Sequence, residues 1–158
     1  MAESAQSSRW LDPAEDRAWR GWLAMEQLLR TQLARDLQAE CGLSESDYMV
    51  LVHLSERADG KMRMSELASR LQWSRSRLSH HIARMHGRGL VAREGCPSDA
   101  RGWFAVITDV GRAEIVGAAP RHVASVRRHF IDVLDAEQLA SLAEITNAVV
   151  ARLLKADS

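Results

Sequence analysis

The residues between positions 74 and 84 have the side-chain chemistry needed to bind DNA. An arginine can donate two hydrogen bonds to the edge of a guanine, and serine hydroxyls and an imidazole can bond to bases or to phosphate oxygens. Serines at the start of a helix also lie where free backbone N–H groups attract a phosphate. The candidate DNA-binding residues of this segment are Ser74, Arg75, Ser76, Arg77, Ser79, His80 and Arg84.

A helix that begins after Ser74 would present these side chains together. Ser74 is a favourable N-cap, and apolar residues recur at helical spacing from Leu78 to Met85 as a buried face. At about 100° per residue, the opposite face carries small and hydrogen-bonding residues that let the backbone approach a groove. These are Ser76, His80, Ala83 and Gly87. The simpler alternative is that Arg77 and Arg84 only keep an amphipathic helix in solution.

The segment around this helix is basic, although the whole chain of 158 residues has a formal net charge of zero. Residues 61–101 contain nine Lys and Arg against three Asp and Glu, whereas residues 1–60 contain six against eleven. A local excess of positive charge is typical of a surface that binds anions such as nucleic acid. A solvated charged face is again the alternative.

Two short helices followed by a hairpin predict a winged helix-turn-helix in the middle of the chain. Residues 65–71 predict a first helix capped by Ser65, and residues 72–73 form a tight turn to the second helix. Strands are predicted at 90–94 and 103–108, joined by a long polar loop. In this motif the second helix enters the major groove of DNA.

Long helices are predicted on both sides of this lobe. Asp12-Pro13 marks a helix start and Gly42 its end, which makes a helix roughly 40 Å long. Another helix begins at Asp109, with a kink or a break at Pro120, and a last one begins at Asp135 in capping-box form. The expected buried stripe of the helix after Asp109 is Ile115, Val116, Val123, Val126, Phe130 and Leu134.

The predicted fold class is therefore mainly α with a small β-hairpin wing. We expect a flexible arm at 1–12, a dimerisation helix at 13–43, a winged lobe at 44–108 with its wing at about 90–108, and C-terminal dimerisation helices at 109–158. The terminal helices are too long to be covered by a compact monomer, so they require a partner.

Over nearly its whole length, the chain resembles the multiple-antibiotic-resistance regulator (MarR) family of winged-helix transcription factors. The resemblance is most specific at residues 64–71, 78–85 and 88–93, in the wing at 97–101, and at Thr108 and Gly111. It implies that Arg101 reaches into the minor groove and that Asp99 helps to hold it. A narrow minor groove concentrates negative potential, which agrees with that role. A surface ion pair that only stabilises the turn is the alternative.

The chain departs from the common pattern at Trp73, Trp103 and Phe104, which we expect to pack the hairpin against the helices. The resemblance also implies a homodimer, built through the first and last helices, that binds double-stranded DNA at a pseudo-palindromic operator. The expected function is that of a repressor released by a small-molecule effector. Interface candidates are Trp10, Leu11, Leu153 and Leu154.

The resemblance further implies a small aromatic or anionic effector, bound between the dimerisation helices and the winged lobe. Aromatic and soft side chains occur where the first two helices would meet, and a plain hydrophobic core is the alternative. The candidate effector-binding residues are Trp19, Trp22, Met25, Met49 and His53.

Other classes of function have weaker support in the sequence. Cys96 is expected on the exposed wing near Arg93 and Arg101, where cations favour a reactive thiolate, so a redox-sensing regulator stays an alternative. A winged-helix module that binds protein without DNA is a second alternative. No motif of an enzyme, a metal site or a cofactor is present, and no run of about 20 apolar residues predicts a membrane span. We expect a cytoplasmic protein.

Overall fold

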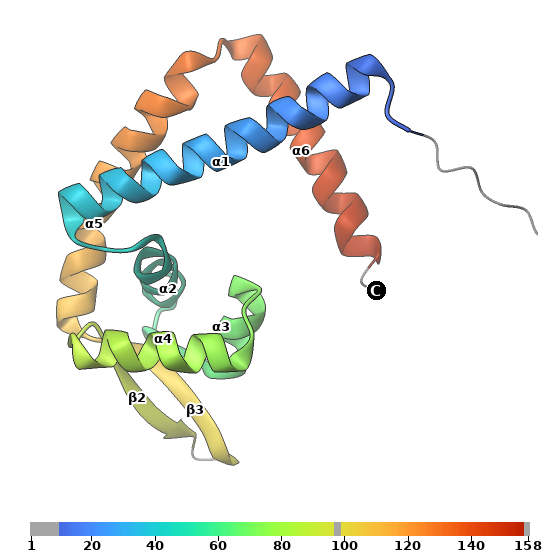
Figure 1. Cartoon of the computed structure of the whole chain (residues 1–158). Coiled ribbons are helices and arrows are strands. Elements are labelled where there is room, and N and C mark those ends of the chain that lie inside the picture. Colours follow the sequence, from blue (N-terminus) through green and yellow to red (C-terminus); the bar gives the residue numbers. More distant parts are fainter. Residues whose placement is uncertain (1–9, 97–98, 157–158) are drawn as a thin grey trace, which may run out of the picture.

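The computed structural model describes residues 10–96 and 99–156, apart from the side chains of residues 99–101 and 156. The predicted arm at 1–12 lies almost wholly outside the described residues. Figure 1 shows the helices and strands in chain order. They are α1 (Pro13–Cys41), α2 (Glu45–Ser55), β1 (Lys61–Arg63), α3 (Met64–Leu71), α4 (Arg75–Gly87), β2 (Val91–Cys96), β3 (Asp99–Ile107), α5 (Asp109–His129), the 3-10 helix η1 (Ile131–Val133) and α6 (Ala136–Ala156).

The middle of the chain forms a winged lobe, which confirms the predicted fold class. Helices α3 and α4 are joined by a tight turn in which Gln72 takes a left-handed conformation, with φ of 54°. The hairpin of β2 and β3 follows, and β1 pairs with the other edge of β3, so the antiparallel sheet has the order β1-β3-β2. The sheet and α4 together form the lower end of the molecule in Figure 1.

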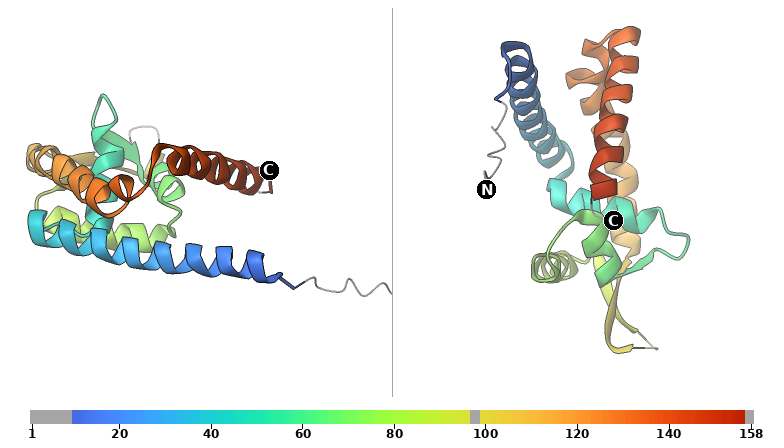
Figure 2. Two further views of the ribbon diagram at one scale, coloured as in Figure 1. Left: turned by 90° about the horizontal axis from the view of Figure 1, so that it is seen from above. Right: turned by 90° about the vertical axis from the view of Figure 1, so that its right-hand side faces the viewer.

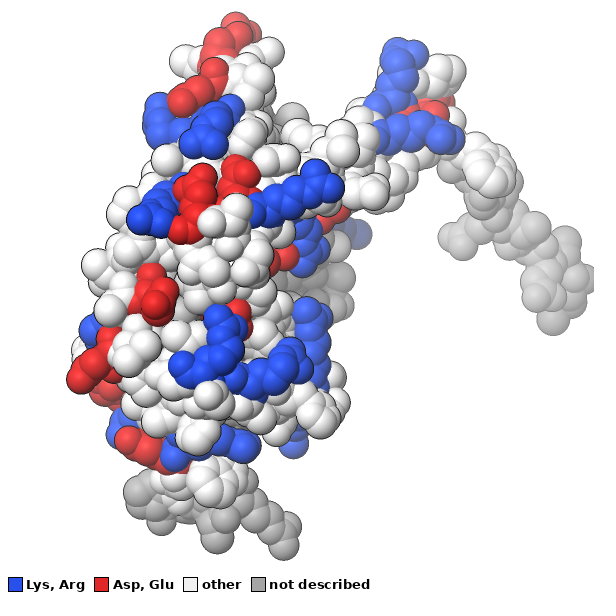
Figure 3. Space-filling model, turned by 60° about the vertical axis from the view of Figure 1, so that its left-hand side comes forward, with Lys and Arg blue, Asp and Glu red and all other residues white. Residues whose placement is uncertain are grey.

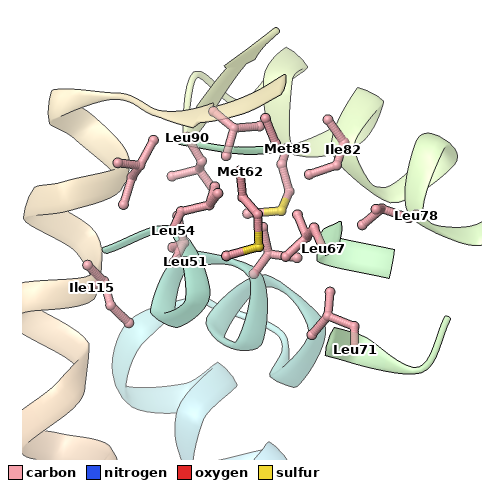
Figure 4. Close-up of a cluster of buried hydrophobic side chains, with 14 of the residues drawn as sticks. Leu51, Leu54, Met62, Leu67, Leu71, Leu78, Ile82, Met85, Leu90 and Ile115 are labelled. Atoms are coloured by element: carbon pink, nitrogen blue, oxygen red, sulfur yellow. The ribbon is translucent and has the colours of Figure 1, made fainter. Parts of the chain in front are cut away.

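A single hydrophobic core holds this lobe together. Leucine, isoleucine and methionine side chains from α2, α3, α4 and the sheet converge in it, and α5 covers it with Ile115 (Figure 4). Each fully buried side chain of this size contributes about 1.5–3 kcal/mol to folding. The predicted buried face of α4 is confirmed, because Leu78, Ile82 and Met85 are completely inaccessible to solvent.

The helix starts predicted at Asp12, Ser74 and Asp135 are confirmed, and one prediction is wrong. Asp12 caps α1, Asp135 caps α6 and Ser44 caps α2, each in a complete capping box, and Ser74 caps α4. The prediction that Ser65 caps α3 is wrong, because α3 begins at Met64 directly after β1, without a side-chain cap. Strand pairing of residues 61–63 fixes the chain up to this point and leaves no room for a capping turn.

The wing lies where it was predicted, but its strands extend further toward the tip and its loop is shorter. Strand β2 runs to Cys96 and β3 begins at Asp99, whereas the sequence indicated a loop over 95–102. Gly95 pairs with Trp103 across the hairpin, and the register shifts between Gly95 and Cys96. Backbone pairing across the hairpin therefore overrides the local preference of turn-forming residues.

Helix α5 is continuous through Pro120, and its path in Figure 1 bends along its length. Proline lacks the N–H that would bond to the carbonyl four residues earlier, which favours such a bend over a straight helix. Of the predicted buried stripe, Ile115 is buried, Val126, Phe130 and Leu134 are half-buried, and Val116 and Val123 are exposed. The helix also buries Ala118 and Ser125, because α1 and α2 cover this side of it and leave the side of Val116 and Val123 open.

Helices α1 and α6 extend from the lobe as two separate arms (Figure 2). Their apolar side chains are largely exposed on the single chain, including Leu28, Val149 and Leu153. Within the part of the chain that the structure describes, no helix combines the length and apolar character required to span a bilayer.

A carboxylate on α1 fixes α5 in place. The hydroxyl of Ser125 donates a hydrogen bond of 2.6 Å to Asp36, Gln32 donates one of 2.8 Å, and Nε2 of His129 lies 3.0 Å away. The hydrogen bond from Ser125 is the largest cause of a pKa of Asp36 below its usual value, and Gln32 and His129 add to it against the opposing effect of desolvation.

We expect the Asp36 contact to make stability depend on pH. A carboxyl group whose pKa is lowered by folding contributes stability above its unfolded pKa of about 3.9, and this contribution is lost as the pH falls through the folded pKa. Ser125→Ala should therefore lower the free energy of unfolding at pH 7 more than at pH 3, measured by urea denaturation. Thr31→Ala is the control, since its hydroxyl bonds only to the backbone of Gln27. An equal loss at both pH values would contradict this account.

Candidate nucleic-acid interface

Helix α4 presents a polar, positively charged face on the surface of the winged lobe. The hydroxyl of Ser74 accepts a hydrogen bond of 3.2 Å from the backbone N–H of Arg77 and so caps the helix. Ser79 is half-buried, and Ser74 and the other candidates on α4 are exposed, namely Arg75, Ser76, Arg77, His80 and Arg84. Figure 3 shows Lys and Arg side chains gathered over the lower half of the molecule, where this lobe lies.

The guanidinium of Arg77 stacks on the ring of Trp73. Its Cζ atom lies 4.2 Å from the ring centroid, a short distance for a cation–π contact. Trp73 is half-buried and packs against the core with the rest of its side chain. The sequence placed both residues correctly near the turn but did not indicate that they touch.

A second arginine of α4 is held by a buried histidine. The Nη2 atom of Arg84 lies 2.9 Å from Nδ1 of His81, and Nε2 of His81 lies 3.1 Å from the buried carboxylate of Asp47. Arg88, at the end of α4, donates a 2.7 Å hydrogen bond to the same carboxylate. Sequence reasoning missed His81 and Asp47 because they lie in different helices, 34 positions apart.

A cleft of about 410 Å³ separates α4 from the wing. Arginines from three elements line it: Arg63 from β1, Arg75 from α4 and Arg93 from β2. Ser79 and Trp103 also line the cleft, and the hydroxyl of Ser79 and the indole of Trp103 are groups that can contact a bound anion. Three guanidinium groups around one cleft favour a phosphate there. Arg63 and Arg93 were not among the predicted site residues.

The aromatic residues of the wing do not pack against the helices as predicted. Trp103 is half exposed, and the guanidinium of Arg93 lies 5.6 Å from its ring centroid. Phe104 has Lys61 and Arg63 at 5.5 Å from its ring. Trp103 and Phe104 are consecutive residues of β3 and point to opposite faces of the sheet, so each ring contacts basic side chains on its own face and neither belongs to the hydrophobic core.

The wing residues Asp99 and Arg101 have backbones in β3, where Asp99 pairs with Cys96. Their side chains lie outside the described residues, so their predicted roles stay predictions. Among the described ion pairs, none involves Arg75, Arg77 or Arg84. The alternative of a module that binds protein without DNA would follow if these three arginines and Arg101 were engaged in ion pairs within the chain, and the side chain of Arg101 lies outside the described residues.

A second cavity, of about 420 Å³, lies between α1, α2 and α5. It contains three of the five predicted effector-binding residues, Trp22, Met25 and Met49. Trp19 does not line it, but its ring stacks on that of Trp22 with centroids 5.3 Å apart. His53 does not line it either. The sequence missed the polar residues that line this cavity, among them Tyr48 and His122.

His122 gives this cavity an unused hydrogen-bonding group. Its ring lies 4.5 Å from that of Tyr48, and its Nδ1 atom is buried without a hydrogen-bond partner among the described residues. Desolvation lowers the pKa of His122, with a smaller opposing effect of Glu45, so the ring is neutral at pH 7. Arg30 and Glu45 bond to each other across the rim.

Cys96 is buried, which corrects the expectation of an exposed thiol on the wing. Arg63 lies against it, with Nη2 3.0 Å from Sγ. Burial removes the access to oxidants on which the redox-sensing alternative depended. Within the described ranges, no group of three or more His, Cys, Asp and Glu side chains is placed to hold a metal ion.

Comparison with known proteins identifies the same lobe. Residues 42–102 match the family model described as MarR family. The structure of AbsC, a MarR family transcriptional regulator from Streptomyces coelicolor, is 48% identical, with a TM-score of 0.87 over 94% of this chain and 99% of that chain. Sco3205 from the same organism, solved in complex with DNA, is 43% identical, with a TM-score of 0.84 over 90% of this chain and 89% of that chain.

A more distant structure shares the fold alone. CouR from Rhodococcus jostii RHA1, solved with p-coumaroyl-CoA, is 21% identical, with a TM-score of 0.70 over 89% of this chain and 95% of that chain. The curated proteins contain no match. The winged lobe, the arginine-rich α4 and the likeness to two regulators over nearly the whole length agree with each other: the chain belongs to the MarR family of transcriptional regulators.

Proposed function

We propose that this regulator is a homodimeric repressor that binds a specific pseudo-palindromic operator and is released by a small aromatic effector. The observation that carries the DNA-binding part is the position of the arginine cleft beside α4. When α4 enters the major groove and the wing approaches the minor groove, the strand between the two grooves has to cross this cleft. Sco3205 was solved in complex with DNA, which supports DNA binding by this chain.

The proposed DNA contacts divide by chemistry. Ser76, Arg77 and His80 contact base edges in the major groove. Arg84 contacts the same groove from further along the same helix. Ser74, Ser79 and the cleft arginines bind phosphates and fix the register without reading sequence. Arg101 enters the minor groove, with Asp99 holding it.

The exposed apolar sides of α1 and α6 support the dimer. Trp10 is 87% exposed, and Leu11, Leu153 and Leu154 are more than half exposed. An exposed apolar surface of this extent on two long helices is typical of a protein interface. Isologous pairing of these arms would place two α4 helices about one turn of DNA apart, which gives the operator its two-fold symmetry.

The cavity between α1, α2 and α5 supports effector binding. Its walls are mostly apolar, with Trp22 and Tyr48 able to stack on an aromatic ring and Nδ1 of His122 available to accept a hydrogen bond. CouR was solved with an aromatic thioester, which supports an aromatic guest in this fold. We propose that occupation of this cavity releases the operator.

DNA binding is tested first by selecting bound fragments from random or genomic DNA with the wild-type protein. Against the selected operator, Arg77→Ala should cost about 1–3 kcal/mol and relax the preference at one base pair, because a bidentate contact is lost. Arg93→Ala should instead weaken all sequences alike and reduce the slope of log K against log salt by about one.

Arg20→Ala is the matched control for these variants, since Arg20 lies on α1 and pairs with Asp16. Its operator affinity and salt slope should equal those of the wild type. Unchanged affinity of both Arg77→Ala and Arg93→Ala would refute the assignment of the interface.

The dimer is tested by Val149→Asp on α6, which should convert the protein to a monomer because a carboxylate cannot be desolvated in an apolar interface. Sedimentation velocity should show the change in mass, and operator affinity should fall at least tenfold as the second half-site is lost. Ala151→Asp, at an exposed position on the opposite side of the same helix, is the control for added charge. A wild-type protein that sediments as a monomer would contradict the proposed assembly.

The effector site is tested by filling the cavity with Met49→Trp. A panel of aromatic acids and their thioesters is screened for release of the wild-type protein from its operator by fluorescence anisotropy. The variant should bind the operator normally but should need at least a tenfold higher concentration of the active compound. Release of both proteins at the same concentration would place the effector elsewhere.

A further inference from the structure

Five residues from the turn to the end of α4 form one stripe along the helix. Trp73, Arg77, His81, Arg84 and Arg88 are spaced by four, four, three and four positions, so they lie above one another on one side. This side lies between the buried face of α4 and the face proposed to enter the groove. The stripe carries the two arginines of α4 to which we assign contacts in the major groove.

The turn residue Trp73 makes contact with two members of the stripe. Arg77 lies over its ring at 4.2 Å, and the ring of His81 stands nearly perpendicular to it, at 85° with centroids 5.4 Å apart. The indole is itself half-buried against the core. Packing against the core fixes the orientation of the indole ring, so Arg77 stacks on a flat surface that is held in place.

His81 extends the same arrangement to Arg84. A guanidinium has only donors, so Nδ1 of His81 accepts the 2.9 Å hydrogen bond from Arg84 and the ring proton is on Nε2. That Nε2 atom faces Asp47 at 3.1 Å, and Asp47 is fixed by Arg88 and by the cap of α2. Contacts through Trp73 and His81 thus connect both arginines to the buried carboxylate of Asp47 in α2.

We propose that Trp73 and His81 are positioning residues that hold Arg77 and Arg84 in their DNA-reading orientations before DNA binds. A free arginine loses rotamer freedom when it contacts a base, whereas an arginine that is already held loses less. Arg77 remains exposed on the open side of the indole, so its donors stay available. The proposal rests on the DNA-binding function proposed above and adds to it the source of specificity.

The test is a double-mutant cycle between Trp73→Leu and Arg77→Ala, with affinities measured for the selected operator and for the operator altered at the base pair that Arg77 reads. A cation–π contact at an exposed site corresponds to about a two- to fivefold change in affinity. Trp73→Leu should weaken operator binding by about this factor, and should have no further effect once Arg77 is alanine. Trp73→Phe keeps an aromatic face and should recover most of the loss.

A second cycle pairs His81→Gln with Arg84→Ala and does not depend on the first. Glutamine can still donate to Asp47 but offers no acceptor in the place of Nδ1, so the contact to Arg84 is removed together with the ring contact to Trp73. The loss caused by His81→Gln should again disappear in the Arg84→Ala background. This cycle decides the question if Trp73→Leu fails to fold.

Trp103→Leu on the wing is the matched control, because Trp103 is an exposed indole that stacks with Arg93 and not with Arg77. Its effect should add to that of Arg77→Ala without coupling. Equal losses from Trp73→Leu in both backgrounds would show a role in the fold only, and tighter binding would show that the indole sequesters Arg77. Either result overturns the proposal, whereas a wild-type protein that binds no DNA refutes the proposed function itself.

Discussion

The buried carboxylate of Asp47 is the constraint on which the arrangement of the winged lobe depends. Burial alone would raise the pKa of Asp47, but contacts from His81, Arg88 and Ser44 outweigh it and hold the pKa well below its usual value. A charge removed from water requires such partners, and the loss of one leaves the others uncompensated. Because these partners come from the start of α2 and from the middle and end of α4, one side chain sets the position of α4 relative to the hydrophobic core.

Much of the fold could be predicted from local signals. The capping boxes at Asp12 and Ser44, the glycine that ends α1 and the apolar face of α4 are patterns within a few residues, and the structure contains each of them. The strand ends at the tip of the wing were predicted less accurately, because pairing across a hairpin depends on the opposite strand and not on local turn preference. Val116 was misplaced for a similar reason: an apolar pattern on a helix does not indicate how wide a face its neighbours will cover.

In the candidate site, too, features within one helix could be predicted, whereas contacts between distant elements could not. The polar face of α4 could be read from the sequence, since it is a property of one helix. The cleft formed with Arg63 and Arg93, and the contact of His81 with Asp47, join elements that lie far apart in the sequence, and no spacing rule predicts them. Trp73 was noticed only as an unusual residue. Its contact with Arg77 depends on the left-handed turn at Gln72, which directs the chain into α4.

Helix α2 connects the cavity beside α1 and α5 with the carboxylate that anchors α4. Tyr48 and Met49 line the chamber beside α1 and α5, and the residue before them is the carboxylate that anchors α4. These three residues lie together near the start of an 11-residue helix, and the arginine and histidine that bind the carboxylate belong to α4 and its C-cap. A guest that displaces the start of this helix would therefore move the carboxylate, and α4 would be shifted with it without any change in its own structure.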